Sequence, residues 1–339
     1  MPLLLRAPGV LRAAALLAAA AAFGACAGPQ ITRNPNSELN SVRKVSVLPF
    51  AETPAQKRIA GEWETLLLSL GYRVMERGSM EKILGEQGLS VSGLVNPVQA
   101  PRIGALLGVD GIVFGKPNPK DPYHSYTMAG APRISEPPPV SVKLVETGTA
   151  RVVWNIANEA ENKLQVSRVG RAVDGALRKA MQKTLGEGAW SNTPPAGFYR
   201  ESGASVIAFN PGLLPPPAMR VGVYPFLVAA RDGDGGVWAD KFAGLLLGAG
   251  YDVVDRQNLE KVLQEQNISL KGIVRLEDII KLGKIAGLRG IVFGTVYGGE
   301  VCAYQAKLVD VETGELYWSA YGEDCQLDQL AGLIKTPGN

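Results

Sequence analysis

An internal repeat constrains the fold of this chain more than any other feature. Segments that share residues occur twice, in the same order, and from residue 71 to residue 115 the two copies align without a gap. The matched segments are 44–50 with 220–226, 71–77 with 250–256, 81–87 with 260–266, 111–115 with 290–294, and 144–146 with 308–310. A repeat of this length predicts that one arrangement of helices and strands is built twice.

Each copy carries strand and helix signals in alternation. A short apolar run is typical of a strand buried on both faces, whereas apolar residues at helical spacing that end at a glycine indicate a helix. In the first copy we expect strands at 45–48, 72–75, 111–115, 140–145 and 151–156, and helices at 56–70, 79–87 and around 103–107. Ser79 is expected to cap the second helix. The order predicts parallel strands joined by right-handed crossovers, followed by antiparallel strands. The fold class is therefore α/β, with two tandem domains that each have helices packed on a mixed sheet.

Two details of the repeat predict local geometry. Gly104 and Gly283 occupy the same position inside the third helix of each copy, which indicates a close approach of that helix to the sheet. A hairpin turn is expected between Asp310 and Gly314, where the glycine suits a left-handed backbone. Ala150 stands where Gly314 stands in the second copy, so the first turn is expected to have a different backbone.

The repeat also suggests how the chain is divided. With 339 residues, 46% of them apolar, the chain is long enough for two domains that each bury a core. We expect a lipoprotein signal peptide at 1–25, a tether at 26–41, a first domain at 42–188, a Pro-rich linker at 189–219 with one strand-like patch at 206–209, and a second domain at 220–339.

The N-terminal segment predicts export and a lipid anchor. Arg6 and Arg12 precede an Ala-rich apolar run at 13–23, which has the length of a secretory signal and is too short to span a bilayer. The residues before Cys26 resemble the bacterial lipobox, which implies lipid attachment at Cys26. Ala27 follows in place of aspartate, and by resemblance to the known sorting rule this favours the outer membrane. The alternative is an ordinary cleavage site with an incidental cysteine.

Two further cysteines, Cys302 and Cys325, lie at similar distances from the predicted Asp310–Gly314 turn. In an oxidising compartment such a pair is able to close a disulfide across paired strands. Two buried free thiols remain the alternative.

Nothing in the sequence predicts catalysis, a cofactor or a metal site. His124 is the single histidine, in a Pro-rich loop, and no phosphate-binding glycine motif follows a strand. The formal charge of +3 includes two arginines of the signal segment, so a nucleic-acid surface is not expected. The chain is therefore predicted not to be an enzyme.

The loop at 116–139 is the largest difference between the copies. Insertions on a rigid scaffold often carry binding, and Tyr123, His124, Tyr126 and Met128 are the candidates for a partner site here. The alternative is a loop with no binding role. Its prolines are expected to prevent strand pairing.

Taken together, the repeated motifs resemble a known family. The V-x-V-x-P-F strand, G-Y-x-V-x-x-R, G-I-V-F-G and the D-x-x-T-G turn are similar to the CsgG family of curli-assembly lipoproteins. A similar fold is shared by lipoprotein activators of peptidoglycan synthases and the N-terminal domain of TolB. The resemblance implies an outer-membrane lipoprotein, periplasmic in its bulk, that works through contacts with envelope proteins.

Two functions follow from this resemblance. The first is non-enzymatic support of envelope assembly or secretion, and the alternative is activation of a peptidoglycan synthase. The short tether weighs against the alternative, because crossing the periplasm takes a longer arm. A homo-oligomer is left open, with a monomer or small oligomer expected because the tandem fusion replaces a subunit contact.

Overall fold

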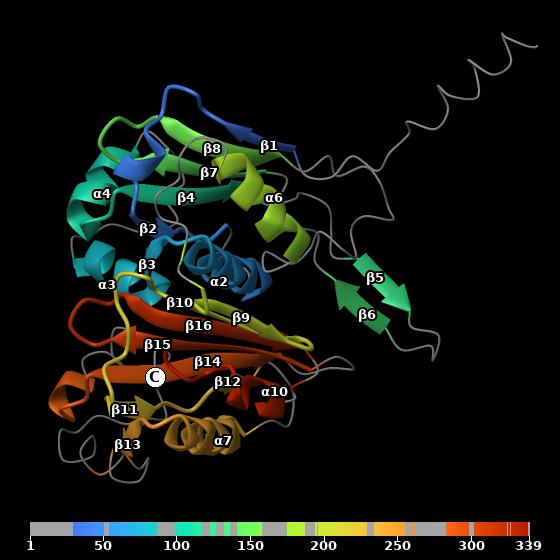
Figure 1. The fold of residues 1–339 in the computed structure, drawn as a ribbon, viewed down its shortest axis with the longest axis vertical. Coiled ribbons are helices and arrows are strands. Elements are labelled where there is room, and N and C mark those ends of the chain that lie inside the picture. The colour runs from blue at the N-terminus through green and yellow to red at the C-terminus, as the bar shows by residue number, and fades with distance from the viewer. Residues whose placement is uncertain are drawn as a thin grey trace, which may run out of the picture.

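A computed structural model of the chain shows two α/β units that pack on each other (Figure 1). It describes residues 30–50, 54–86, 99–116, 123–126, 132–135, 141–157, 175–186, 194, 196–228, 234–254, 259, 261, 283–297, 302–323, 325 and 327–337. From one end of the molecule to the other, the layers are the first sheet, helix α2, the second sheet and helix α7.

The first unit is a six-stranded sheet with the strand order β1-β8-β7-β4-β2-β3. Its strands are β1 (Gln30–Arg33), β2 (Lys44–Val47), β3 (Arg73–Met75), β4 (Gly111–Lys116), β7 (Ser141–Glu146) and β8 (Val152–Ala157). Its helices are α2 (Pro54–Ser69), α3 (Arg77–Glu86), α4 (Ala100–Leu107) and α6 (Gly175–Gly186), and a 3-10 turn η2 (Leu39–Ser41) precedes β2. Strand β2 is parallel to β3 and β4, whereas β4, β7, β8 and β1 are antiparallel neighbours. This confirms the predicted order of parallel and antiparallel strands.

The second unit repeats this arrangement in an eight-stranded sheet with the order β13-β11-β14-β15-β16-β10-β9, in which β12 also pairs with β14. Its strands are β9 (Tyr199–Ser202), β10 (Ser205–Phe209), β11 (Arg220–Val223), β12 (Leu227–Val228), β13 (Asp252–Val254), β14 (Gly290–Tyr297), β15 (Ala303–Asp310) and β16 (Leu316–Glu323). Helix α7 (Gly235–Gly248) begins after Asp234, whose side chain accepts a hydrogen bond from the Gly236 N–H, and α10 (Leu327–Ala331) follows the last strand.

The two sheets share their register residue by residue. Lys143 lies opposite Asn155 in the first sheet, and Lys307 lies opposite Ser319 in the second. Both sheets carry the same irregularity one position later, between Leu144 and Val145 and between Leu308 and Val309. The two tandem copies predicted from the sequence are therefore present in the fold.

Each unit also has a strand that lies in a segment expected to be a tether or a linker. Strand β1 falls within 26–41, the expected tether, and pairs antiparallel with β8. Strand β10 falls within the expected linker 189–219, at the strand-like patch, and pairs antiparallel with β16. Both segments thus contribute to the sheets.

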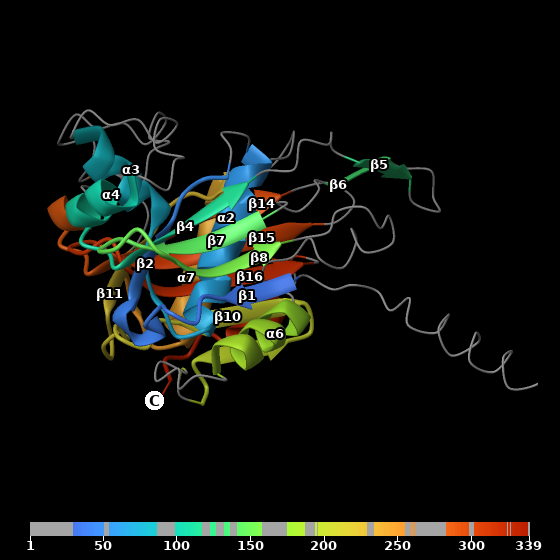
Figure 2. The same ribbon diagram turned by 90° about the horizontal axis from the view of Figure 1, so that it is seen from above.

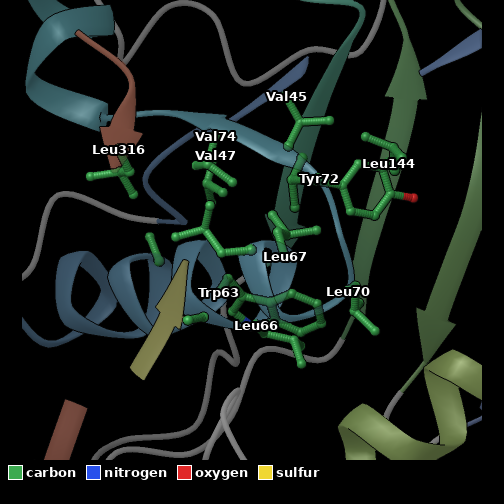
Figure 3. Close-up of a cluster of buried hydrophobic side chains, with 14 of the residues drawn as sticks. Val45, Val47, Trp63, Leu66, Leu67, Leu70, Tyr72, Val74, Leu144 and Leu316 are labelled. Carbon is green, nitrogen blue, oxygen red and sulfur yellow. The ribbon is translucent and has the colours of Figure 1, made fainter. Parts of the chain in front are cut away.

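The hydrophobic core is not divided between the repeats as expected. One buried cluster contains α2 and the first sheet together with Val309 and Leu316 of the second repeat. Figure 3 shows Leu316 beside the side chains of the first repeat. Helix α2 explains this, because Leu66, Leu67 and Leu68 are consecutive and all fully buried. A helix that is buried all round needs an apolar surface on both sides, and here the second sheet supplies one of them.

The close approach predicted at Gly104 and Gly283 is confirmed. A Cβ atom on Gly104 would overlap the Thr147 side chain, and one on Gly283 would lie 2.6 Å from side-chain atoms of Ile291 and Val311. A larger residue at either position would push the helix away from the sheet.

The prediction for the first hairpin turn is wrong. Ala150 has φ of 56° and Gly314 has φ of 69°, so both turns use the left-handed backbone. Alanine adopts this conformation at a cost of about 1–2 kcal/mol. The shared strand register fixes the turn geometry in both copies, whichever residue occupies the position.

Exchanging the residues at this position is expected to change stability in opposite directions. Ala150→Gly should raise the free energy of unfolding by about 0.5–1 kcal/mol, because relief of the left-handed strain exceeds the extra chain entropy of glycine. Gly314→Ala should lower it by about 2 kcal/mol, since its Cβ would also lie 2.6 Å from the Ser79 side chain. Urea denaturation of both variants checks this, and a stability loss in Ala150→Gly would contradict it.

Candidate interaction surfaces

Helix α2 of the first repeat lies on strands β10 and β16 of the second sheet. Thr65 Oγ1 and Ser319 Oγ are hydrogen-bonded at 2.7 Å, and the Arg58 guanidinium lies 5.4 Å from the centre of the Tyr297 ring. A Cβ atom on Gly61 would overlap the Gln305 side-chain amide, so a glycine is needed for this close packing. The contact is therefore continuous along the helix.

A buried charge cluster crosses the same contact. The Lys307 ammonium donates to the Glu64 carboxylate and lies 3.4 Å from Oε1 of Glu76. The exposed fractions of the three side chains are 6% for Lys307, 1% for Glu64 and 3% for Glu76. Burial raises the pKa of Glu64, although the Lys307 charge opposes this shift. Lys307 thus forms ion pairs with two buried carboxyl groups of the other repeat.

Glu76 has a second role at the start of α3. Its carboxylate accepts hydrogen bonds from the backbone N–H groups of Gly78 and Ser79. The prediction that Ser79 caps this helix is wrong, because α3 begins at Arg77 and Ser79 lies inside it. Glu76 therefore links the helix start to Lys307.

Glu315 ties the hairpin turn of the second repeat to the edge of the first sheet. It accepts from Arg73 Nε at 3.1 Å and from Arg73 Nη2 at 2.8 Å, and Lys44 Nζ lies 3.0 Å from its Oε1. The Glu76 N–H donates to the Gly314 carbonyl at 2.9 Å. The turn between β15 and β16 is therefore anchored to β3 by side-chain and backbone contacts.

The turn itself is held by Asp310. Its carboxylate accepts from the Tyr317 hydroxyl at 2.6 Å and from the backbone N–H groups of Glu312 and Thr313. Burial alone would raise the pKa of Asp310, but these hydrogen bonds together lower it. Burial and the hydrogen bond to Asp310 raise the pKa of Tyr317 to about 12, so Tyr317 remains a donor.

Sequence reasoning missed these charged residues. Lys307 and Glu64 are ordinary surface residues by type, and only the run Leu66-Leu67-Leu68 signals that α2 is covered on all sides. In the described part of the chain, no group of three His, Cys, Asp or Glu side chains is placed to hold a metal ion.

The predicted partner loop contains a short hairpin. Tyr123, His124 and Tyr126 lie on β5 (Tyr123–Tyr126), which pairs antiparallel with β6 (Pro132–Ser135). The expectation that prolines prevent pairing in this loop is wrong, since Pro132 stands at the first position of its strand, where a missing N–H is tolerated. Met128 lies outside the described residues.

The structure places Cys302 directly before β15 and Cys325 just after β16, and joins them in a disulfide. Their Cα atoms are 5.3 Å apart, within the range that a disulfide requires. Cys325 has a left-handed φ of 54°, which turns the chain back toward Cys302. The bond would close the open end of the hairpin opposite the Asp310 turn.

Cys26 lies outside the described residues. Among the helices that the structure does describe, none has the length and apolarity to cross a membrane.

A family model gives an independent comparison. Residues 244–304 match the model described as curli production assembly/transport component CsgG. Part of the second repeat is similar to the CsgG family. The matched segment runs from the end of α7 through β14 into β15. The resemblance inferred from the repeated motifs is thereby confirmed for this segment. The first repeat shares strand order and register with the second.

Solved structures similar to this chain each cover about a third of it. The LpoB C-terminal domain from Salmonella enterica is 19% identical, with 33% of this chain and 84% of that chain covered and a TM-score of 0.29. Lipoprotein GNA1162 from Neisseria meningitidis is 28% identical, with 32% and 79% covered and a TM-score of 0.26. The PelC dodecamer from Paraburkholderia phytofirmans is 16% identical, with 35% and 78% covered and a TM-score of 0.24. A search of curated proteins finds no match.

Proposed function

We propose that this protein is a non-enzymatic lipoprotein, anchored to the outer membrane through Cys26, that supports envelope assembly or secretion through protein–protein contacts. The observation that carries the proposal is the close packing of two similar repeats, in which buried charged side chains are paired across the contact. Across the repeat contact, Lys307 forms an ion pair with Glu64, and Glu315 forms one with Arg73. The outer surfaces are then the part of the molecule that meets other proteins.

The position of β1 supports action close to the membrane. Strand β1 begins at Gln30, so residues 27–29 alone separate Cys26 from the first sheet. An extended residue spans at most about 3.6 Å, and three of them reach about 10 Å. A lipid on Cys26 would therefore hold the folded body at the periplasmic face of the outer membrane. This short reach weighs against the alternative, activation of a peptidoglycan synthase across the periplasm.

Lipid attachment is tested by a Cys26→Ala variant in cells fed labelled palmitate. The label should be lost and the protein should move from the membrane fraction to the soluble periplasmic fraction, because each buried CH₂ contributes about 0.8 kcal/mol to membrane binding. The matched control replaces Cys302 and Cys325 by serine and should keep its label. Label that persists in Cys26→Ala would contradict the anchor.

The partner class is tested by crosslinking in living cells followed by mass spectrometry. Capture of an outer-membrane assembly or secretion component would support the proposal. Capture of an inner-membrane peptidoglycan synthase would favour the alternative.

A further inference from the structure

The two sheets differ at one edge. Strand β10 of the second sheet lies between β16 and β9, whereas its counterpart β1 pairs only with β8 in the part of the chain that the structure describes. Figure 2 shows β1 as the outermost strand of the first sheet, with α6 alongside. Among the described residues, the first sheet therefore has no counterpart of β9.

Matching hydrogen bonds establish how β1 and β10 correspond. The side-chain amide of Asn34, just after β1, donates to a carbonyl at the start of β8 at 2.9 Å, and that of Asn210, just after β10, donates to a carbonyl at the start of β16 at 2.8 Å. The backbone N–H of each asparagine donates to the next residue of the same neighbouring strand. Asn34 and Asn210 are therefore equivalent, and the residues before them correspond one by one.

The free edge of β1 carries backbone groups that β10 pairs with β9. Because hydrogen-bonded residues alternate along an antiparallel strand, the bond from Asn34 to β8 leaves the N–H and C=O groups of Ile31 and Arg33 pointing away from β8. Their counterparts are Ile207 and Phe209, and the Phe209 N–H donates to a carbonyl just before β9 at 2.8 Å. Ile207 and Phe209 are fully buried, whereas Ile31 and Arg33 are half-buried. An unpaired edge of this kind is a template for another strand.

The surroundings of this edge are positively charged. The Nε atom of Arg33 is buried and has no hydrogen-bond partner among the described residues. Helix α6, which contacts β1, carries Arg178, Lys179 and Lys183 and has no acidic residue along its length. Lys179 and Lys183 are exposed. A strand with a carboxylate opposite Arg33 complements this edge, because opposite charges on facing residues stabilise a strand pair.

The segment before β1 does not supply such a strand in the mature protein. By the same correspondence, β9 (Tyr199–Ser202) matches residues 23–26. The inference rests on the proposed function at this point, since cleavage before Cys26 removes residues 1–25. Only Cys26 of the matching segment then remains, and the strand has to come from another molecule.

We propose that an extended acidic segment of a partner protein adds to the free edge of β1 as an antiparallel strand, with a carboxylate opposite Arg33 and an apolar residue opposite Ile31. Strand β9 on β10 is the template for this pairing. Main-chain hydrogen bonds supply the affinity, and the facing side chains supply the selectivity. The edge of β1 is thus one outer surface through which the protein contacts an envelope partner.

Peptide binding tests the proposal. The probe copies residues 197–202 with Phe198→Glu and Arg200→Val, the positions that face the counterparts of Arg33 and Ile31. The mature protein in detergent should bind this probe more tightly than one with Phe198→Lys, as measured by fluorescence anisotropy. The bound probe should also slow hydrogen exchange at the backbone amides of Ile31 and Arg33. A probe N-methylated at positions 198 and 200 keeps the carboxylate but cannot pair with the strand, so it should not bind.

Charge reversal in the protein tests the facing residue. Arg33→Glu should weaken binding of the glutamate probe about five- to tenfold and make the lysine probe the better ligand. Arg151→Glu, at an exposed arginine just before β8, is the matched control and should leave the preference unchanged. Equal binding of the two probes by the unmodified protein, or no reversal in Arg33→Glu, would overturn the proposal.

Closing the edge within the chain gives a second test. Replacing residues 27–29 by a copy of residues 198–205 places β9 and its turn before β1, and binding of the glutamate probe should be lost. A glycine–serine insertion of the same length is the control and should keep it. Slow exchange at Ile31 and Arg33 without any probe would show that this chain or a second copy already covers the edge, and would refute the proposal. Palmitate labelling at Cys26 is independent of these results, so failure here leaves the proposed function standing.

Discussion

Replacing Lys307 by methionine is expected to lower the free energy of unfolding by about 3–5 kcal/mol, the cost of removing one partner from a buried ion pair. Methionine has a side chain of similar length but removes the ion pairs that Lys307 forms with Glu64 and Glu76. Chemical denaturation measured by circular dichroism gives the value.

The repeat supplies a matched control for this variant. Lys143 occupies the same register position in the first sheet, where it is half-buried. Lys143→Met should therefore change the free energy of unfolding by no more than about 0.5 kcal/mol. Equal losses in the two variants would show that the repeat contact is not what makes Lys307 important.

The decrease in the free energy of unfolding caused by Lys307→Met should also depend on pH. Burial raises the pKa of Glu64 in the folded protein. A carboxyl group whose pKa is higher in the folded than in the unfolded state takes up a proton on folding, so its contribution to stability falls as the pH rises. Removing Lys307 should raise the pKa of Glu64 further, because the Lys307 charge lowers it. The variant should therefore lose less stability in mildly acidic buffer than at neutral pH.

Removing the bond between Cys302 and Cys325 is expected to lower the free energy of unfolding by about 3 kcal/mol, since a crosslink restricts the unfolded chain. The two cysteines are 23 residues apart in the sequence. The variant in which both are serine should unfold at lower urea concentration than the unmodified protein, and a reducing agent should bring the unmodified protein to the same midpoint.

A thiol titration separates this result from its alternative. If Cys302 and Cys325 are free thiols, both will react in the unfolded, unreduced protein, and the reducing agent will leave the urea midpoint unchanged. The doubly substituted variant provides the baseline, because it lacks both groups.

Features within one repeat could be predicted because they depend on local patterns. The glycine after α2, the parallel order of β2, β3 and β4, and the close approach at Gly104 all follow from residues that recur in both copies. Strand β1 could not be predicted in this way, since its sequence is mostly polar and its pairing with β8 decides its conformation. The left-handed backbone of Ala150 could not be predicted for the same reason, because the paired strands on either side impose the geometry of the turn.

The sequence by itself determined the repeat, its strand order and the positions at which a helix must approach the sheet closely. Tertiary structure alone decided which of two equivalent residues is buried. Lys143 and Lys307 have the same residue type and register, yet Lys307 compensates two carboxyl groups in the interior because α2 covers it. Packing of the repeats places the α2 face of the first repeat against the sheet face of the second. No local sequence pattern indicates which of the equivalent helix and sheet faces form this contact.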